Sequence, residues 1–166
     1  MSTTVVSDLD SQLLRAAFGC FPSGVTAVCA LVEGAPLGIV ASSYTSVSMN
    51  PPLVSVCMGS TSSTWPRLRH SARFGINVLA EGQGELCRQL AAKDTDRFAG
   101  VDFDTTIDGA VLMSESATWL ECSIHSELDA GDHTIVLFEI HEVSREPHRL
   151  PLVFHGSKFR QLAEAV

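Results

Sequence analysis

Short apolar segments separated by turn residues make up most of this chain. Residues 25–32 and 53–58 are rich in apolar and β-branched side chains, a pattern typical of buried strands. Residues 37–43 follow the first of these runs directly after Glu33-Gly34, a dipeptide that favours a hairpin turn. The pattern therefore predicts antiparallel strands that are connected locally.

More strands are expected in the second half of the chain. They are residues 74–79, the two long runs 117–128 and 134–143 joined by a tight connection at 129–132, and a last short strand at 152–155. Residues 99–116 are rich in turn formers and show no strong pattern.

Helical periodicity is confined to short segments. Asp8 or Asp10 can cap the first of them. The expected helical elements are residues 13–18, a short helix after residues 62–64 with Pro66 in its first turn, residues 84–92, and a terminal turn that starts near Ser157.

Short helices between locally linked strands predict a mainly β fold, a closed antiparallel barrel with small helices at its ends. The length of 166 residues suits one domain with a substantial core. We expect this domain to span residues 11–162, between a flexible N-terminus (residues 1–10) and a C-terminal tail (residues 163–166).

Composition narrows the function. Hydrophobic residues make up 45% and charged residues 18% of the chain, which leaves apolar surface that an oligomer interface would cover. The net charge of −8 argues against nucleic-acid binding. Five cysteines without a Cys-x-x-Cys pair indicate reduced thiols in a cytoplasmic protein. No signal peptide and no apolar run of membrane-spanning length is present in the sequence.

Residues 38–53 combine small polar residues with apolar flanks. Seven of these sixteen residues are glycine or carry a hydroxyl group. Hydroxyl side chains and free backbone N–H groups at a strand end can hold a phosphate and the polar rim of a flat ring system. Pro51 and Pro52 end the stretch, because proline cannot donate to a sheet ladder. The segment predicts a cofactor seat.

The run Ser62-Ser63-Thr64 before the short helix has two interpretations. It can be a plain helix cap, which contributes about 1 kcal/mol. It can also be an anion site, because the first N–H groups of a helix are free and its dipole is positive there. The nearby hydroxyl-rich segment favours the anion site.

Gly131-Asp132-His133 is likewise either an ordinary turn or a place where a histidine beside a carboxylate orients a ligand. Other chemistries find little support. The chain has no Gly-x-Ser-x-Gly elbow and no His-x-x-x-His metal spacing, so neither a serine hydrolase nor a metal site is predicted.

Taken in order, several segments resemble the short flavin reductases with the FMN-binding split-barrel fold, the reductase components of two-component flavin-dependent monooxygenases. These segments are Phe21-Pro-Ser-Gly-Val-Thr26, Ala41-Ser-Ser-Tyr-Thr-Ser-Val-Ser48 with Pro51-Pro52-Leu53, Phe74-Gly-Ile-Asn-Val-Leu79, Asp96-Arg-Phe-Ala-Gly100, Glu121-Cys122, Gly131-Asp-His133 and Pro151-Leu-Val-Phe154 with Gly156.

The resemblance implies a six-stranded antiparallel split β-barrel that forms a homodimer, with a flavin at the dimer edge. It also implies roles for individual residues. Ala41, Ser42 and Ser43 would contact the flavin, Ser46, Val47 and Ser48 would face its ring edge, Ser63 and Thr64 would hold its phosphate, Lys93 would be a nearby basic group, His133 would lie on the nicotinamide side, and Phe159 would lie near the ring.

The function expected from this resemblance is NAD(P)H:flavin oxidoreductase activity, with FMN or FAD reduced by hydride transfer and passed to a partner monooxygenase. Two alternatives remain: a non-catalytic split-barrel protein that binds FMN or haem, and a structural subunit of an oxygenase complex. The sequence does not distinguish FMN from FAD, or NADH from NADPH.

Overall fold

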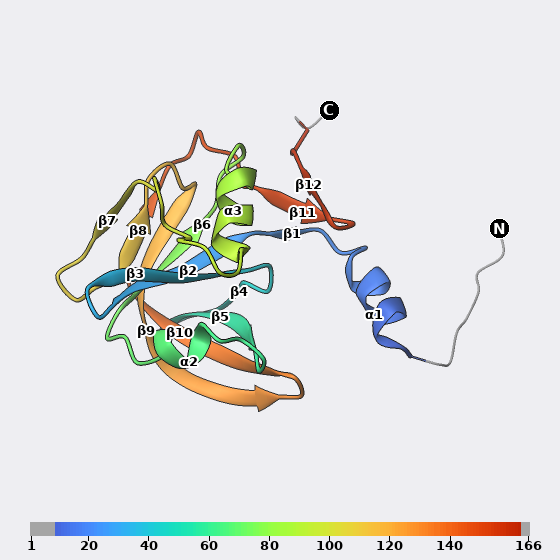
Figure 1. The fold of residues 1–166 in the computed structure, drawn as a ribbon, viewed down its shortest axis with the longest axis horizontal. Helices are drawn as coiled ribbons and strands as arrows, with labels where there is room; N and C mark the ends of the chain where they lie inside the picture. The colour runs from blue at the N-terminus through green and yellow to red at the C-terminus, as the bar shows by residue number, and fades with distance from the viewer. Residues whose placement is uncertain (1–8, 164–166) are drawn as a thin grey trace.

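The computed structural model describes residues 9–163. Residues 1–8 and 164–166 lie outside it, and with them Asp8 and most of the two predicted tails. Within the described range the chain folds around one large antiparallel sheet, with three short helices and two small sheets at its margins (Figure 1).

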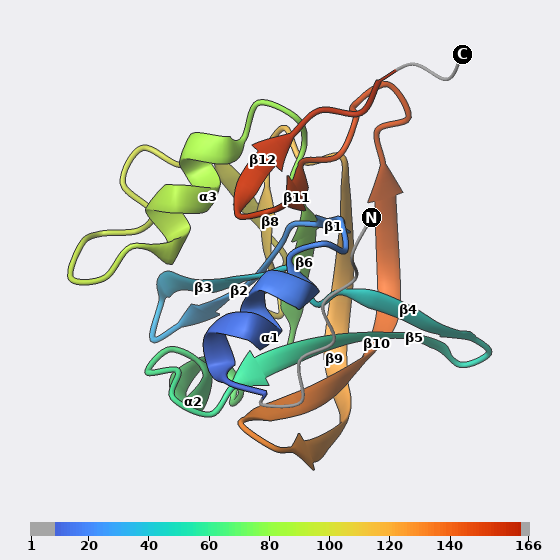
Figure 2. The ribbon, with the colours of Figure 1, turned by 90° about the vertical axis from the view of Figure 1, so that its right-hand side faces the viewer.

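The large sheet has seven strands in the order β3-β2-β6-β9-β10-β5-β4. Their bounds are β2 Thr26–Val32, β3 Ala35–Ala41, β4 Thr45–Met49, β5 Pro52–Gly59, β6 Phe74–Val78, β9 Thr118–Ala130 and β10 His133–Arg145. The predicted closed ladder of six strands therefore differs from the observed one. The sheet curls strongly (Figure 2), but its end strands β3 and β4 are not hydrogen-bonded neighbours in the part described.

Two small sheets complete the strands. One joins β1 (Ser23–Gly24), β11 (Val153–His155) and β12 (Lys158–Arg160), and the other joins β7 (Phe103–Thr105) and β8 (Val111–Met113). The helical turn predicted from Ser157 is wrong. Gly156 and Ser157 both have positive φ, at 56° and 60°, which makes a two-residue hairpin turn between β11 and β12.

The helices are α1 (Ser11–Phe18), α2 (Trp65–Leu68) and α3 (Gly84–Ala91). The cap predicted for α1 is confirmed, because Leu13 N donates to Asp10 Oδ1 at 2.7 Å. In Figure 1 this helix stands away from the sheet, and none of its residues is buried. None of the helices between residues 9 and 163 has the length and apolar character of a membrane span.

The core lies on both sides of β2, because alternate residues of this strand face different clusters. Val28 packs with Phe74 and Phe138 inside the curl of the sheet. Cys29 packs on the other face, in the cluster that α3 covers. Burial raises the pKa of the Cys29 thiol, and it raises that of Cys122 to about 12. Both thiols are buried, and the raised pKa makes them poor nucleophiles.

Candidate functional site

A cavity of about 500 Å³ opens between β3, the start of α2 and the segment after α3. Pockets of a few hundred cubic ångströms are the usual size for small-molecule sites. The lining residues are Pro36, Leu37, Ser63, Thr64, Arg67, Asp94, Thr95, Asp96, Arg97 and Phe98.

Thr64 and Arg97 meet at this cavity. Thr64 is buried, with 7% of its surface exposed, and its Oγ1 accepts a hydrogen bond from Arg97 Nη1 at 3.0 Å. The same Nη1 lies 3.4 Å from the carbonyl oxygen of Gly38 on β3. A guanidinium carries five N–H donors, and within residues 9–163 only one nitrogen of Arg97 is engaged. Its other donors are available to an anion.

At the start of α2, one serine makes the capping contacts and its neighbour faces the cavity. Thr64 is the N-cap residue by position but makes no side-chain cap bond; Ser62 Oγ instead accepts hydrogen bonds from Thr64 N at 3.2 Å and Trp65 N at 3.1 Å, so Ser62 makes the capping contacts. Its neighbour Ser63 is exposed and faces the cavity. A helix of four residues has little dipole, so the positive charge for an anion must come from Arg67 and Arg97.

Acidic residues share the cavity wall. Asp96 Oδ1 accepts a hydrogen bond from Phe98 N at 3.0 Å, which stabilises the turn that carries Arg97. Asp94 also lines the cavity and is exposed. Two arginines and two aspartates therefore line the cavity together.

The hydroxyl-rich segment forms the end of β3 and the edge strand β4. Ser43 Oγ accepts a hydrogen bond from Cys57 N at 2.9 Å, and Ser48 Oγ accepts one from Asn50 N at 3.2 Å, so these two hydroxyls fix the local backbone. Ser46 and Val47 are exposed beside a register shift in the β4–β5 pairing. Within the described residues β4 has a neighbour on one side, so its outer N–H and C=O groups are free for a ligand.

Strand β3 connects this edge to the cavity. Leu37 lines the cavity, and Ala41, four residues further on, ends the strand next to Ser42. Four residues of extended chain span about 13 Å. A ligand with a phosphate at one end and a ring at the other could therefore contact both regions along β3.

His133 lies beside the loop from Ser60 to Ser63, which joins β5 to α2. It begins β10 opposite Gly59 of β5, and Ser60 N donates to Asp132 O at 2.9 Å. His133 Nδ1 is 2.7 Å from Asp132 Oδ1, and this hydrogen bond holds the pKa of the Asp132 carboxyl below its ordinary value. Only the short loop from Ser60 to Ser63 separates this pair from Thr64.

Of the eleven predicted site residues, only Ser63 and Thr64 line this cavity. The six residues of the hydroxyl-rich segment and His133 lie outside it, as do Lys93 and Phe159. Lys93 is exposed after α3 and is not among the residues that line the cavity, although Asp94–Phe98 are. Phe159 on β12 lines a different cavity of about 510 Å³, where the Arg88 guanidinium carbon lies 5.0 Å from its ring centre. The cation–π contact and the nearby Gly84 hold the Phe159 ring over the start of α3.

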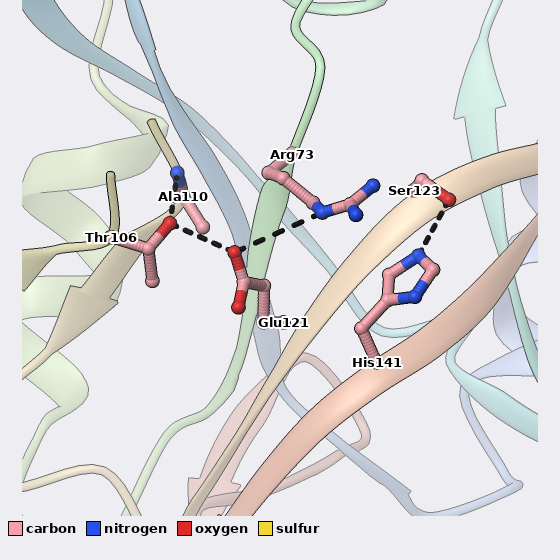
Figure 3. Close-up of polar contacts among 6 residues, drawn as sticks. All are labelled: Arg73, Thr106, Ala110, Glu121, Ser123 and His141. Carbon is pink, nitrogen blue, oxygen red and sulfur yellow. Dashed lines mark hydrogen bonds and ion pairs between the residues drawn. The ribbon is translucent and has the colours of Figure 1, made fainter. Parts of the chain in front are cut away.

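Figure 3 shows polar contacts on the large sheet, away from the cavity. The buried Glu121 accepts a hydrogen bond from Thr106 Oγ1 at 2.8 Å and lies 4.0 Å from Arg73 Nε. Thr106 Oγ1 in turn accepts a hydrogen bond from Ala110 N at 3.1 Å. This chain of contacts fixes the β7–β8 hairpin to the sheet and has a structural role.

The structure adds two residues that the sequence did not assign to the site, Arg67 and Arg97, and it places Ser62 of the predicted hydroxyl run at the helix start rather than in the cavity. Arg97 belongs to the segment Asp96-Arg-Phe-Ala-Gly100, which contributed to the family resemblance. Its contact with Thr64, 33 residues earlier, depends on how α2 and the segment after α3 pack. The motif was therefore the only sequence signal for Arg97, whereas its contact with Thr64 could be found only from the structure.

Comparisons with known proteins identify the family. Residues 18–163 match the flavin reductase like domain. The flavin reductase of Pseudomonas putida is 36% identical over 152 residues, which cover 91% of this chain and 89% of that protein. The reductase subunit of a flavin-dependent monooxygenase from Rhodococcus jostii is 32% identical and covers 91% of this chain and 77% of its own.

A solved structure agrees with these sequences. The NADH:FAD oxidoreductase of Streptomyces globisporus, in complex with NAD and FAD fragments, matches with a TM-score of 0.90 at 38% identity and covers 98% of both chains. The chain therefore belongs to the flavin reductase like family. The resemblance read from the sequence and the mainly β split-barrel fold class are both confirmed.

Proposed function

We propose that this protein is an NAD(P)H-dependent flavin reductase that supplies reduced flavin to a partner monooxygenase. Family membership over residues 18–163 gives the class of reaction. The observation in this structure that carries the proposal is the cavity where Thr64 and Arg97 meet, at the start of the strand β3 whose other end, about 13 Å away, is hydroxyl-rich. That arrangement suits a ligand with one phosphorylated end and one flat polar end.

The residues divide this task between them. Ser63, Arg67 and Arg97 would hold the phosphate, while Thr64 keeps the Arg97 guanidinium in place. The free edge of β4 at Ser46–Ser48 would donate backbone N–H groups to the ring, and such donors stabilise negative charge as it arrives. Ala41, Ser42 and Ser43 would form the floor beneath it.

A bound flavin supplies the hydride acceptor, so the protein needs no nucleophilic side chain. His133 would orient the nicotinamide, and Asp132 would fix the imidazole of His133 through the 2.7 Å hydrogen bond. Lys93 and Phe159 would reach a flavin only from outside this cavity.

The names of relatives support the co-substrates and the partner. One relative is the reductase subunit of a monooxygenase, and a solved neighbour is an NADH:FAD oxidoreductase. We propose NADH or NADPH as donor, FMN or FAD as acceptor, a homodimeric state and a cytoplasmic location. The exposed apolar side chains of Phe18 and Phe21 support the homodimer.

Steady-state oxidation of NADH and NADPH, each with FMN, FAD and riboflavin, tests this function. We expect flavin-dependent oxidation of at least one donor. If the flavin binds but stays oxidised, the protein is a flavin carrier. If no flavin binds, a structural role in an oxygenase complex would replace the proposal.

A further inference from the structure

Helix α2 and the residues just before it carry part of the candidate phosphate site, but this helix is too short to be stable on its own. It has four residues, and a single helical turn in water is unfavourable. Its buried side chains, Trp65 and Leu68, fix it to the core. Because Thr64 immediately precedes the helix, any tilt of α2 moves Thr64 relative to Arg97.

Both ends of this segment are tied to the β9–β10 hairpin, which carries His133. On the N-terminal side, Ser60 N donates to Asp132 O at 2.9 Å. On the C-terminal side, Arg69 Nη2 lies 2.5 Å from Glu127 Oε2 on β9. In Figures 1 and 2, α2 lies at the same end of the molecule as the hairpin. The segment from Ser60 to Arg69 is thus clamped between two contacts with one hairpin.

The contact between Arg69 and Glu127 differs from an ordinary surface ion pair. Exposed pairs contribute little, because water screens them. The Arg69 side chain is 46% exposed, but only 21% of the Glu127 side chain is exposed, and Glu127 Oε1 is buried without a hydrogen-bond partner among the described residues. A carboxylate that has lost this much water depends on its counter-charge, so removing Arg69 would leave it uncompensated.

We propose that Arg69 and Glu127 are a positioning pair that sets the phosphate site on α2 relative to Arg97 and to His133. The inference rests on the proposed function, since it concerns how that site holds a phosphorylated flavin. Neither residue lines the cavity. Their effect is transmitted through the tilt of α2.

The test compares flavin binding without NADH, by quenching of flavin fluorescence. Glu127→Gln is the decisive variant, because simple electrostatics and positioning predict opposite results. Loss of a negative charge would strengthen binding of anionic FMN, whereas loss of the clamp would weaken it. We expect the Kd of FMN to rise about fivefold, the scale of one ordinary hydrogen bond. The Kd of riboflavin, which has no phosphate, should stay within about twofold.

Companion variants complete the experiment. Arg69→Met should weaken FMN in the same way, Arg69→Lys should restore part of the affinity, and Arg69→Met with Glu127→Gln should be no worse than either change alone. Arg149→Met is the matched control, because Arg149 pairs with Glu115 at 2.9 Å outside this cavity. If Arg69→Met fails to fold, Glu127→Gln still decides the question.

The outcomes separate this inference from the proposed function. If the unmodified protein does not bind FMN, the proposed function fails. If it binds FMN, and Glu127→Gln binds FMN as tightly or more tightly, the positioning role is wrong. Equal weakening of FMN and riboflavin would also overturn it, because that result indicates general damage to the fold.

Discussion

At the scale of single residues, the Thr64–Arg97 contact is the feature that most directly links this fold to a phosphorylated ligand. Thr64 is buried and holds an arginine whose remaining donors face a cavity. Most other hydroxyls near the site fix backbone: Ser62 caps α2, and Ser43 binds Cys57. Arg97 thus supplies positive charge at the cavity, and Thr64 fixes the position of its guanidinium group.

Thr64→Ala should weaken FMN binding by about 1 kcal/mol, the usual contribution of one hydrogen bond. Riboflavin should be nearly unaffected, because it has no phosphate. Isothermal titration with both flavins measures the difference. Thr105→Ala on the exposed strand β7 is the control and should change neither affinity. Equal losses for the two flavins would show that Thr64 does not act at a phosphate.

The Asp132–His133 pair predicts a specific dependence on pH. The hydrogen bond from His133 lowers the pKa of Asp132 below its ordinary value of 3.8 in the folded protein. The interaction is therefore fully present above pH 3.8 and is lost as the pH falls through the lower, folded pKa. Carbon NMR of the Asp132 carboxyl should show this depressed pKa. In His133→Gln it should return toward 3.8, and a value unchanged by the substitution would contradict the assignment.

At the scale of elements, Gly75 allows β6 and β8 to pack closely. A Cβ at this position would lie 1.9 Å from the carbonyl oxygen of Val111, a backbone atom that cannot turn aside. Gly75→Ala should therefore separate the strands and lower the free energy of unfolding by about 3 kcal/mol. Urea denaturation measures this loss. Gly24→Ala is the matched control, since nothing lies within 4 Å of its added Cβ.

If the Gly75→Ala variant is as stable as the unmodified protein, then β8 does not pack against β6 in solution. The consequence would reach beyond the core. The β7–β8 hairpin is fixed on its other side by Thr106 and Glu121, so both contacts would be in question.

The elements also show what the sequence can predict. Apolar runs identified β2, β5, β6, β9 and β10, because burial in a core selects β-branched and aromatic residues. The strand β4 was missed because its residues serve an exposed edge and carry hydroxyls. The strands β7 and β8 were missed because three residues are too few to show alternation.

The candidate site divides in the same way. Ser63 and Thr64 were predicted, because a hydroxyl run before a helix is a local signal. Arg97 lies in the motif Asp96-Arg-Phe-Ala-Gly100, but its role depends on a contact with Thr64 in a distant segment, which the sequence alone does not show. Ser157 was misread as a helix start, since a turn with two positive φ angles ordinarily uses glycine or asparagine rather than serine.

At the scale of the whole molecule, the uncovered apolar surface predicts self-association. Phe18 is 70% exposed and Phe21 is 78% exposed, on and just after a helix that stands away from the sheet (Figure 1). We expect a dimer by sedimentation velocity. Burying one phenylalanine contributes about 2 kcal/mol, so Phe18→Ser with Phe21→Ser should raise the dimer dissociation constant more than tenfold. A monomeric unmodified protein would contradict the proposed dimer without affecting the reductase proposal.

The proposed reaction is the transfer of a hydride from a nicotinamide to a flavin on this protein. Anaerobic mixing of the protein with FMN and NADH in a stopped-flow instrument tests it most directly. We expect the visible absorbance of oxidised FMN to disappear much faster than in the same mixture without protein, and we expect the rate to change when FAD replaces FMN or NADPH replaces NADH. An FMN absorbance that persists with every flavin and donor pair, although the protein is folded and binds flavin, would contradict it.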